Sequence, residues 1–370
     1  MRGLRLPLRA DLAGIEPYGA PHLAVPVILN VNENPYAPAE DVVADVAAAV
    51  AAAARGANRY PDREFTALRQ GLAEYLAVES GVEVPPGEIW AGNGSNEVML
   101  HILQAFGGPG RRVLSFTPTY SMYPEYARDT LTEWVARPRG ADFGLDLEAA
   151  VAAIREVGPA IVLLASPNNP TGTALTTAEV GALAAAGRGA GPDGTDAVVV
   201  VDEAYGEFRR QGVASALTLR SDHPNLVVTR TMSKAFAMAG LRLGYLAADR
   251  RVVDALRVVR LPYHLSAITQ AAALAALGHR ETLMAQVASL RAERDALQAW
   301  LGEHGFTAVP SDANFVLFGV FPDRHRVWAQ LLERGILIRE VGPAGYLRVT
   351  VGTPEEIRAF RTALLEVSRD

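Results

Sequence analysis

Short apolar runs alternate with helix-like stretches through the middle of the chain. Four runs rich in valine, isoleucine and leucine predict buried strands, because a strand covered on both faces has few polar positions. These runs lie at residues 112–116, 160–165, 197–201 and 226–229. Residues 147–156 and 177–186 between them show the apolar spacing of amphipathic helices. The alternation predicts an α/β fold whose mainly parallel central sheet is sandwiched by helices, with ligands at the carboxyl ends of the strands.

The carboxyl-terminal third has a different pattern. It begins with a long amphipathic stretch at residues 267–302 and continues with short candidate strands and helices. Strands are expected at 314–318, 336–339 and 346–351, and helices at 326–334 and 354–365. We interpret this region as a smaller α+β domain. The predicted organisation is an amino-terminal arm that forms part of the small domain (1–40), a large domain (41–265) and the small carboxyl-terminal domain (266–370).

Composition and charge exclude several classes of protein. The 370 residues are 49% hydrophobic, which is enough for a full core. The formal net charge of −6 offers no basic face, so no nucleic-acid partner is expected. The absence of cysteine excludes disulfides and thiolate metal sites and fits a cytoplasmic location. The alanine-rich run at 46–54 is too short to cross a bilayer, and no H-E-x-x-H motif occurs, so neither a membrane nor a metal is expected.

Lys234 is the only lysine among the 35 lysine and arginine residues. Arginine serves equally well as a surface cation, so an amine kept at one position suggests a chemical task. A guanidinium stays charged at physiological pH, whereas a lysine amine can lose its proton and form a Schiff base with an aldehyde or ketone. The alternative is that a single lysine remains by chance, and only its neighbours decide between the two.

Polar residues of complementary chemistry follow several predicted strands. Asp202 and Tyr205 come after one strand, and Asn169 lies in the proline- and glycine-rich loop after another. Gly94 and Ser95 open an apolar helix, whose amino terminus suits a phosphate. Each feature alone is an ordinary cap or turn. Together with a reactive amine they match the aldehyde, ring nitrogen, ring hydroxyl and phosphate of pyridoxal 5'-phosphate.

These features make the chain resemble the aminotransferases of PLP fold type I over almost its whole length. Within that family it is most similar to the histidinol-phosphate aminotransferases. The segments that carry the resemblance are IEPY at 15–18, NENPY at 32–36, RYPD at 59–62, PTYSMY at 118–123, SPNNPTG at 166–172, DEAY at 202–205, TMSKAF at 231–236, AGLR at 239–242 and YLRVT at 346–350. The resemblance implies pyridoxal 5'-phosphate as cofactor and a homodimer with a shared active site.

The resemblance also implies roles around the cofactor. Lys234, Asp202 and Tyr205 are expected to be catalytic: Lys234 holds the cofactor and moves a proton, and Asp202 pairs with the ring nitrogen. Tyr205 and Asn169 are expected at the ring oxygen, and Tyr120 on the ring face. The remaining expected cofactor contacts are Gly94, Ser95, Asn96, Ser233, Arg242 and, from a partner subunit, Tyr60. For Tyr60 an exposed aromatic in a turn before a proline is the ordinary alternative.

Substrate anions need further cations. By resemblance Arg348 binds the carboxylate of glutamate or 2-oxoglutarate. Arg339, nine residues earlier, is expected to supply a second guanidinium for a phosphate, and the alternative is that it forms an ion pair with Glu340 or another surface acid. The expected polar and aromatic lining of the substrate pocket consists of Tyr18, Asn96, Tyr123 and Tyr263. Glu33 and Asn34 belong to the family motif, but no role is assigned to them from the sequence.

Three functional hypotheses follow from this pattern. The first is transamination between glutamate and imidazole-acetol phosphate, as in histidine biosynthesis, and its variant uses aromatic 2-oxo acids such as phenylpyruvate. The second is a PLP-dependent decarboxylase of a phosphorylated amino acid. A non-catalytic PLP-binding module is disfavoured, because every catalytic position is occupied.

Overall fold

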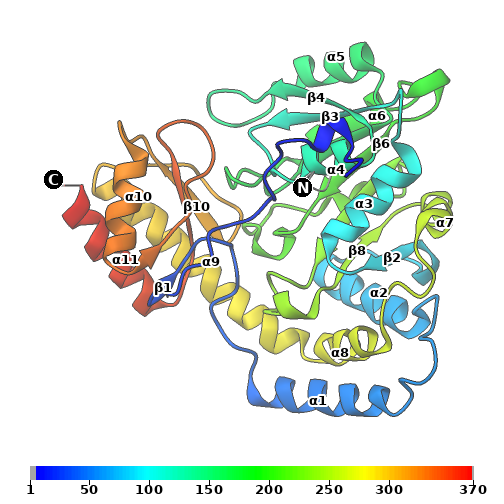
Figure 1. Ribbon diagram of the computed structural model, residues 1–370, viewed down its shortest axis with the longest axis horizontal. Coiled ribbons are helices and arrows are strands. Elements are labelled where there is room, and N and C mark those ends of the chain that lie inside the picture. The colour runs from blue at the N-terminus through cyan, green and yellow to red at the C-terminus, as the bar shows by residue number, and fades with distance from the viewer. Residues whose placement is uncertain (1–5, 369–370) are drawn as a thin grey trace, which may run out of the picture.

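A seven-stranded sheet forms the centre of the computed structural model, which describes residues 6–368 (Figure 1). Its strand order is β2-β8-β7-β6-β5-β3-β4, and β8 runs antiparallel to both neighbours while the other pairs are parallel. The strands are β2 Ile89–Gly92, β3 Arg112–Thr117, β4 Glu133–Pro138, β5 Ile161–Ala165, β6 Val198–Asp202, β7 Leu226–Thr231 and β8 Gly244–Ala247. The predicted α/β fold with a mainly parallel sheet is confirmed.

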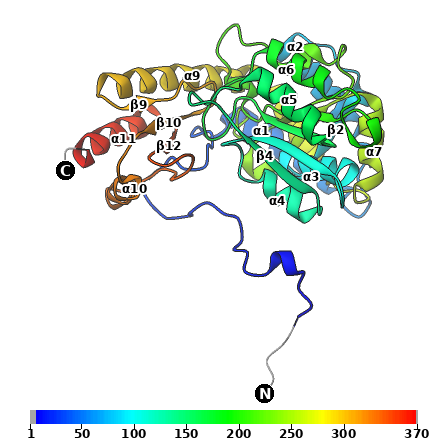
Figure 2. The same cartoon turned by 90° about the horizontal axis from the view of Figure 1, so that it is seen from above.

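Helices cover this sheet on both faces. Figure 2 shows α5 and α6 on one side of β4 and α3 and α4 on the other. The helices of this part are α1 Glu40–Ala54, α2 Thr66–Ser80, α3 Ser95–Phe106, α4 Tyr123–Asp129, α5 Leu147–Val157, α6 Thr177–Ala186, α7 Arg250–Val259 and α8 Ala267–Gly278. Every residue of β5, β6 and β7 is buried. Each buried valine or leucine contributes about 1.5–3 kcal/mol of transfer free energy, which explains the apolar runs.

A second group of elements surrounds a smaller sheet. Strand β10 (Phe315–Gly319) lies between β12 (Leu347–Thr350) and β9 (Thr307–Ala308), antiparallel to both. The amino-terminal segment reaches this part through β1 (Val27–Ile28), which pairs with β11 (Ile336–Leu337). Helices α9 Arg280–Glu303, α10 Arg324–Glu333 and α11 Pro354–Val367 complete it. A separate apolar cluster fills its interior, with Leu301, Phe318 and Phe360 among its members.

Two details of the carboxyl-terminal third differ from the pattern-based prediction. The single long helix expected at 267–302 is two helices, because the backbone leaves the helical conformation at His279 between α8 and α9. The strand expected at 336–339 stops at Leu337, and Arg339 pairs with Arg348 through one isolated bridge. The break at His279 and the end of β11 at Leu337 are set by local backbone geometry, which the spacing of apolar residues does not indicate.

The remaining short elements are 3₁₀ helices. They span Ala10–Leu12, Pro86–Glu88, Pro192–Gly194, Gly206–Phe208, Ala216–Leu219 and Ala239–Leu241. Between residues 6 and 368 there is no helix long and apolar enough to cross a membrane. The ends of the predicted outer domains, residues 1–5 and 369–370, lie outside the described residues.

Candidate active site

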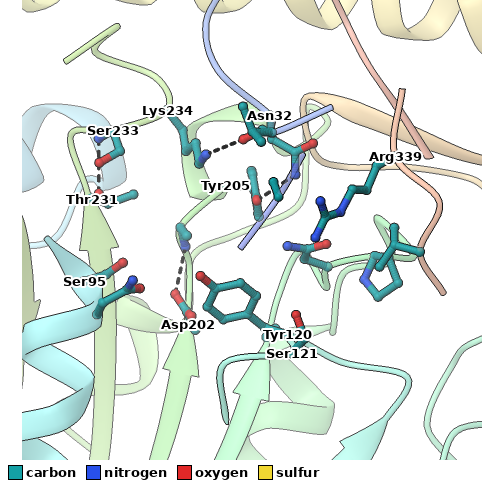
Figure 3. A pocket seen from close by; sticks show the side chains of 18 of the residues that line it. Asn32, Ser95, Tyr120, Ser121, Asp202, Tyr205, Thr231, Ser233, Lys234 and Arg339 are labelled. Atoms are coloured by element: carbon teal, nitrogen blue, oxygen red, sulfur yellow. Dashed lines mark hydrogen bonds between the residues drawn. The ribbon is translucent and has the colours of Figure 1, made fainter. Parts of the chain in front are cut away.

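A cavity of about 260 Å³ lies where three parallel strands end. The last residues of β5, β6 and β7, namely Ala165, Asp202 and Thr231, all line it. The amino-terminal segment and the smaller sheet also line it, through Arg348 and through Asn32, which Figure 3 shows. The predicted site residues that line this cavity are Tyr18, Ser95, Asn96, Tyr120, Asn169, Asp202, Tyr205, Ser233, Lys234, Arg242, Arg339 and Arg348.

Lys234 follows β7 and presents its amine to the cavity. Nζ donates a hydrogen bond to the Val31 carbonyl oxygen at 3.0 Å. Burial, together with the charges of Arg348 and Arg242, lowers the pKa of the amine from 10.5 to about 8, and the charge of Glu33 opposes this lowering. About a tenth of the amine is therefore unprotonated and nucleophilic at pH 7, far more than for an ordinary lysine.

Asp202 ends β6 and is held by three hydrogen-bond donors. Oδ1 accepts from the Thr229 hydroxyl at 3.0 Å and from the Ala204 amide at 3.2 Å, and Oδ2 accepts from the Tyr123 hydroxyl at 3.0 Å. Burial raises the pKa of this carboxyl group, and the three donors oppose the rise. Strand pairing places Thr229 directly beside Asp202. The three donors thus fix the orientation of the carboxylate, which can accept a further hydrogen bond from a group in the cavity.

The amino terminus of α3 forms an anion-binding corner. Its N-cap is Gly94, with φ of +85° and no side chain to occupy the free amides. A Cβ atom at Gly94 would lie 2.5 Å from Nη2 of Arg242, so only glycine lets this guanidinium approach. Nη1 of Arg242 also lies 3.4 Å from the Ser233 hydroxyl. Free amides, a hydroxyl and a guanidinium therefore converge at one corner, which is the donor set that a phosphate requires.

Two polar groups lie between this corner and the smaller sheet. The Tyr205 hydroxyl accepts a hydrogen bond from Nδ2 of Asn32 at 2.9 Å, and Oδ1 of Asn169 accepts one from Nη1 of Arg348 at 2.5 Å. Tyr120 packs edge-on against Tyr123, with ring centroids 5.6 Å apart. Burial raises the pKa of both Tyr120 and Tyr205, which therefore stay protonated donors.

Two arginines face the cavity from the smaller sheet. Arg348 is buried over the Phe315 ring, and its Nη2 donates to the Asn30 carbonyl oxygen at 2.8 Å. Burial lowers the pKa of Arg348 to about 10. The backbone of Arg339 pairs with that of Arg348, and its Nη2 lies 3.3 Å from the Gly19 carbonyl oxygen.

The ion pair between Arg339 and Glu340, which was the alternative expectation for Arg339, does not form among the described residues, because Glu340 has other partners. Glu340 is paired with Arg324 at 3.1 Å and with His325 at 3.0 Å. Arg339 instead lines the cavity, and its guanidinium donates to the Gly19 carbonyl oxygen.

Four predicted site residues do not line the cavity. Gly94 lies directly behind Ser95, and Tyr123 is fully buried behind Asp202, to which it donates. Tyr60 and Tyr263 stack on each other with centroids 4.4 Å apart, and Tyr60 is 80% exposed. Within one subunit these two tyrosines therefore lie on the surface.

The structure also adds residues that the sequence did not single out. Asn30, Val31 and Asn32 contact Arg348, Lys234 and Tyr205 respectively. Asn32 begins the NENPY segment at 32–36, whereas Asn30 and Val31 precede it. No local pattern indicates that three successive residues contact three different elements. Thr229, by contrast, could have been found by aligning the two apolar runs that form β6 and β7, because the pairing puts it next to Asp202.

Comparison with known proteins agrees with this geometry. Residues 25–364 match the family described as aminotransferase class I and II. The chain belongs to this family. It is 61% identical to the histidinol-phosphate aminotransferase of Thermobifida fusca over 97% of this chain and 95% of that one. The histidinol-phosphate aminotransferase of Bifidobacterium longum is 54% identical, with 98% and 97% covered.

Solved structures show the same likeness. The histidinol-phosphate aminotransferase of Sinorhizobium meliloti in complex with pyridoxal 5'-phosphate superposes with a TM-score of 0.81 at 28% identity, covering 93% of this chain and 91% of that one. Aspartate aminotransferase of Thermus thermophilus with maleate gives 0.78 at 27% identity, covering 92% and 91%.

The cofactor of this aminotransferase is pyridoxal 5'-phosphate. The donor set of the cavity fits it: an amine of lowered pKa, a fixed carboxylate, phenol and amide groups, and the anion-binding corner at Gly94. The glycine that admits Arg242 is the feature of this structure that most directly suits a phosphate group.

Proposed function

We propose that this chain is a histidinol-phosphate aminotransferase, which transfers an amino group between glutamate or 2-oxoglutarate and histidinol phosphate or imidazole-acetol phosphate. The observation that carries the substrate assignment is the pairing of Arg339 with Arg348 at the cavity that holds Lys234. Two guanidiniums suit a phosphate dianion and a carboxylate in turn. The high identity to named relatives supports the same substrate.

The bound cofactor supplies an electron sink and a temporary carrier for the amino group. In this proposal Lys234 is the base that takes a proton from the substrate carbon and delivers it to a neighbouring carbon. Its lowered pKa and its fixed position beside the reacting atoms favour this role. Asp202 would accept a hydrogen bond from the ring nitrogen, and its negative charge would stabilise the proton there. Thr229 and Tyr123 keep the carboxylate oriented for this contact.

The other cofactor contacts follow from position. Ser95, Asn96, Ser233 and Arg242 line the cavity and would hold the phosphate next to Gly94, while Tyr205 and Asn169, which also line it, would meet the ring oxygen. We propose that Tyr120 stacks on the ring face of the cofactor, as the resemblance of the chain to the family implies. Tyr123 was expected to contact the substrate. We propose instead that its buried hydroxyl orients Asp202.

Substrate binding needs an exchange of hydrogen bonds. Arg348 now donates to Asn169 and to the Asn30 carbonyl oxygen, and an incoming carboxylate would replace part of that set with a charge-assisted pair. Tyr18 accepts a hydrogen bond from the Ser121 hydroxyl at 3.2 Å beside this position. We propose that Tyr18 and Asn96 border the imidazole end of the substrate.

We further propose a homodimer in which Tyr60 reaches the phosphate corner of the partner subunit. Its 80% exposed ring beside Tyr263 supports this, since an aromatic pair on the surface is available to a second subunit. The cytoplasmic location stays a prediction.

The assay that tests the substrate compares histidinol phosphate with phenylalanine, each with 2-oxoglutarate, using purified holoenzyme. Histidinol phosphate should give the higher kcat/KM, and a clear preference for phenylalanine would replace the proposal with an aromatic aminotransferase. Glutamate alone should change the cofactor absorbance without releasing carbon dioxide. Release of carbon dioxide from a phosphorylated amino acid would instead support a decarboxylase.

Arg339→Gln should sharpen this test. Removing one charged hydrogen-bonding partner of a phosphate costs about 1.5–3 kcal/mol, so kcat/KM for histidinol phosphate should fall roughly ten- to hundredfold. The value for phenylalanine, which lacks the phosphate, should change far less. Arg137→Gln on the exposed strand β4 is the matched control and should leave both values unchanged. Equal losses for both substrates would argue against a phosphate contact by Arg339.

A further inference from the structure

A chain of hydrogen bonds joins the smaller sheet to Tyr205 through Asn32. Asn32 is 1% exposed and has a left-handed backbone with φ of +57°. Its amide nitrogen Nδ2 donates to the Tyr205 hydroxyl at 2.9 Å, and its Oδ1 accepts from the Thr350 hydroxyl at 3.1 Å. Thr350 lies on β12, two residues after Arg348. Figure 3 shows Asn32 beside Tyr205 at the edge of the cavity.

Three hydrogen bonds hold Asn32 between Thr350 and Tyr205. The backbone N–H of Asn32 can only donate, and it donates to Oγ1 of Thr350 at 3.0 Å. The one proton of the Thr350 hydroxyl then serves Oδ1 of Asn32. In this arrangement the amide of Asn32 has its NH₂ group toward Tyr205 and its oxygen toward Thr350.

This orientation decides what Tyr205 can do. Because Oη of Tyr205 accepts from Asn32, the phenol proton is not used in that contact and remains available to another acceptor. Burial raises the pKa of Tyr205, while the Arg348 charge and the hydrogen bond from Asn32 oppose the rise. Tyr205 lines the cavity, so an acceptor there can receive this proton.

We propose that Asn32, oriented by Thr350, is a positioning residue that keeps the phenol proton of Tyr205 directed at the ring oxygen of the bound cofactor. The inference rests on the role proposed above for Tyr205. It gives the asparagine of the amino-terminal segment a task in the chemistry of the site. It also links the placement of β12 to the hydrogen bond that Tyr205 makes.

The competing role for Asn32 is structural anchoring alone. Its backbone carbonyl accepts from Nδ2 of Asn314 at 3.1 Å, and its φ suits asparagine better than most residues. Anchoring would affect stability and cofactor affinity, but it would not act through the Tyr205 hydroxyl.

The deciding variant is Asn32→Gly. Glycine adopts the left-handed conformation without strain, so the change removes the side chain and leaves the backbone path open. The readout is the pH midpoint of the absorbance change of the bound cofactor, measured without substrate. A weaker donation by Tyr205 leaves more negative charge on the ring oxygen, which favours a proton on the neighbouring nitrogen of Lys234. The midpoint should therefore rise, by about half a unit to one unit for the loss of one hydrogen bond.

Tyr205→Phe separates this inference from the role that it rests on. The phenylalanine variant should raise the midpoint at least as much as Asn32→Gly, and adding Asn32→Gly to it should cause no further rise. No shift in Tyr205→Phe would refute the role of Tyr205 itself. A shift in Tyr205→Phe without one in Asn32→Gly would refute only the positioning role of Asn32, as would an equal further shift in the double variant.

Thr350 provides an independent pair of variants if the Asn32 change impairs folding. Thr350→Val keeps the shape but removes the hydroxyl, so it should raise the midpoint in the same direction. Thr350→Ser retains the hydroxyl and should keep the midpoint of the unchanged protein. Equal midpoints in the valine and serine variants, both folded by circular dichroism and loaded with cofactor, would overturn the proposal.

Discussion

At the scale of single residues, the environment of Lys234 converts a common side chain into a reactive one. Its amine lines the cavity, hydrogen-bonds a backbone carbonyl and has two guanidiniums nearby. Both burial and like charge favour the neutral form. An arginine in the same place would stay charged and could not form a covalent link to an aldehyde.

The lowered pKa of Lys234 predicts the pH at which the amine reacts. Folded apoprotein treated with formaldehyde and a mild reductant should be methylated at Lys234 with a midpoint near pH 8, because the pKa is lowered from 10.5 to about 8. The neutral form increases as pH rises through that value, so modification increases with pH. Peptide mass spectrometry separates Lys234 from the terminal amine, and urea-unfolded protein is the control, with its midpoint returned to above 10. A midpoint above 10 in the folded protein would contradict the burial argument.

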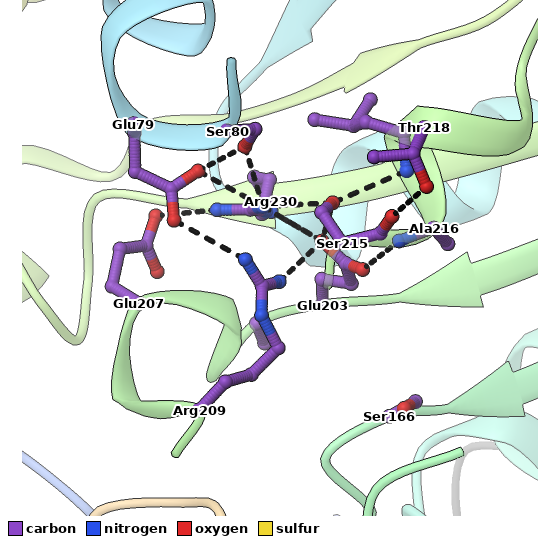
Figure 4. Close-up of polar contacts among 12 residues, drawn as sticks. Glu79, Ser80, Ser166, Glu203, Glu207, Arg209, Ser215, Ala216, Thr218 and Arg230 are labelled. Carbon is purple, nitrogen blue, oxygen red and sulfur yellow. Dashed lines mark hydrogen bonds and ion pairs between the residues drawn. The ribbon is translucent and has the colours of Figure 1, made fainter. Parts of the chain in front are cut away.

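At the scale of elements, a buried ion cluster ties together the strands that carry Asp202 and Lys234. Arg230 of β7 pairs with Glu203, which follows β6, at 2.7 Å, with Glu207 at 2.9 Å and with Glu79 at the end of α2 at 3.2 Å (Figure 4). Arg209 adds a second guanidinium, 3.0 Å from Glu203. The side chain of Arg230 is only 1% exposed. This cluster therefore fixes β6 and β7 relative to each other from behind the cavity.

Arg230→Met should destabilise the protein strongly. The substitution removes the guanidinium that pairs with Glu203, Glu79 and Glu207 and leaves these buried carboxylates insufficiently neutralised. We expect the free energy of unfolding to fall by about 3–5 kcal/mol. The free energy of unfolding from urea titrations, followed by fluorescence, measures it. Arg137→Met on exposed β4 removes an arginine from a surface pair and should cost less than about 0.5 kcal/mol. If both variants behaved alike, the cluster would contribute nothing beyond an exposed ion pair.

At the scale of the whole molecule, the cavity lies between two apolar clusters that α9 and the amino-terminal segment connect. Leu290 of α9 belongs to the cluster under the large sheet, and Leu301 of the same helix to the cluster of the smaller one. Helix α8 packs on α1 and α2. We therefore propose that the division between the two domains falls within α9. This proposal places the second boundary later in the chain than the predicted residue 265, and the boundary at residue 40 stays a prediction.

The proposed shared site predicts complementation between two inactive variants. Tyr60→Ala and Lys234→Ala should each show little activity as homodimers. A mixed dimer contains one complete site, with Lys234 from one chain and Tyr60 from the other. Unfolding and refolding the two variants together should then restore up to about a quarter of normal activity, because half of the dimers are mixed and each has one good site. Separate refolding of each variant is the control, and no gain on mixing would show that Tyr60 does not act across subunits.

Much of this architecture was predictable because it depends on local chemistry. Buried strands need apolar residues on both faces, so β3, β5, β6 and β7 were visible as apolar runs. Polar residues after such runs meet at one edge of a parallel sheet, so the sequence predicts that Asp202 and Lys234 lie at the same edge. The interruption at His279 was not visible, because the apolar spacing continues on both sides of it.

What the sequence alone determined is the cofactor chemistry: one amine, a carboxylate after a buried strand and a glycine at a helix amino terminus are properties of short segments. Only the tertiary structure decided which side chains orient these groups through hydrogen bonds. Tyr123 turned out to face Asp202 rather than line the cavity, and Asn32 to reach Tyr205, 173 residues away in the chain. Such contacts depend on how separate elements pack, and no periodicity within one segment records where a distant segment will lie.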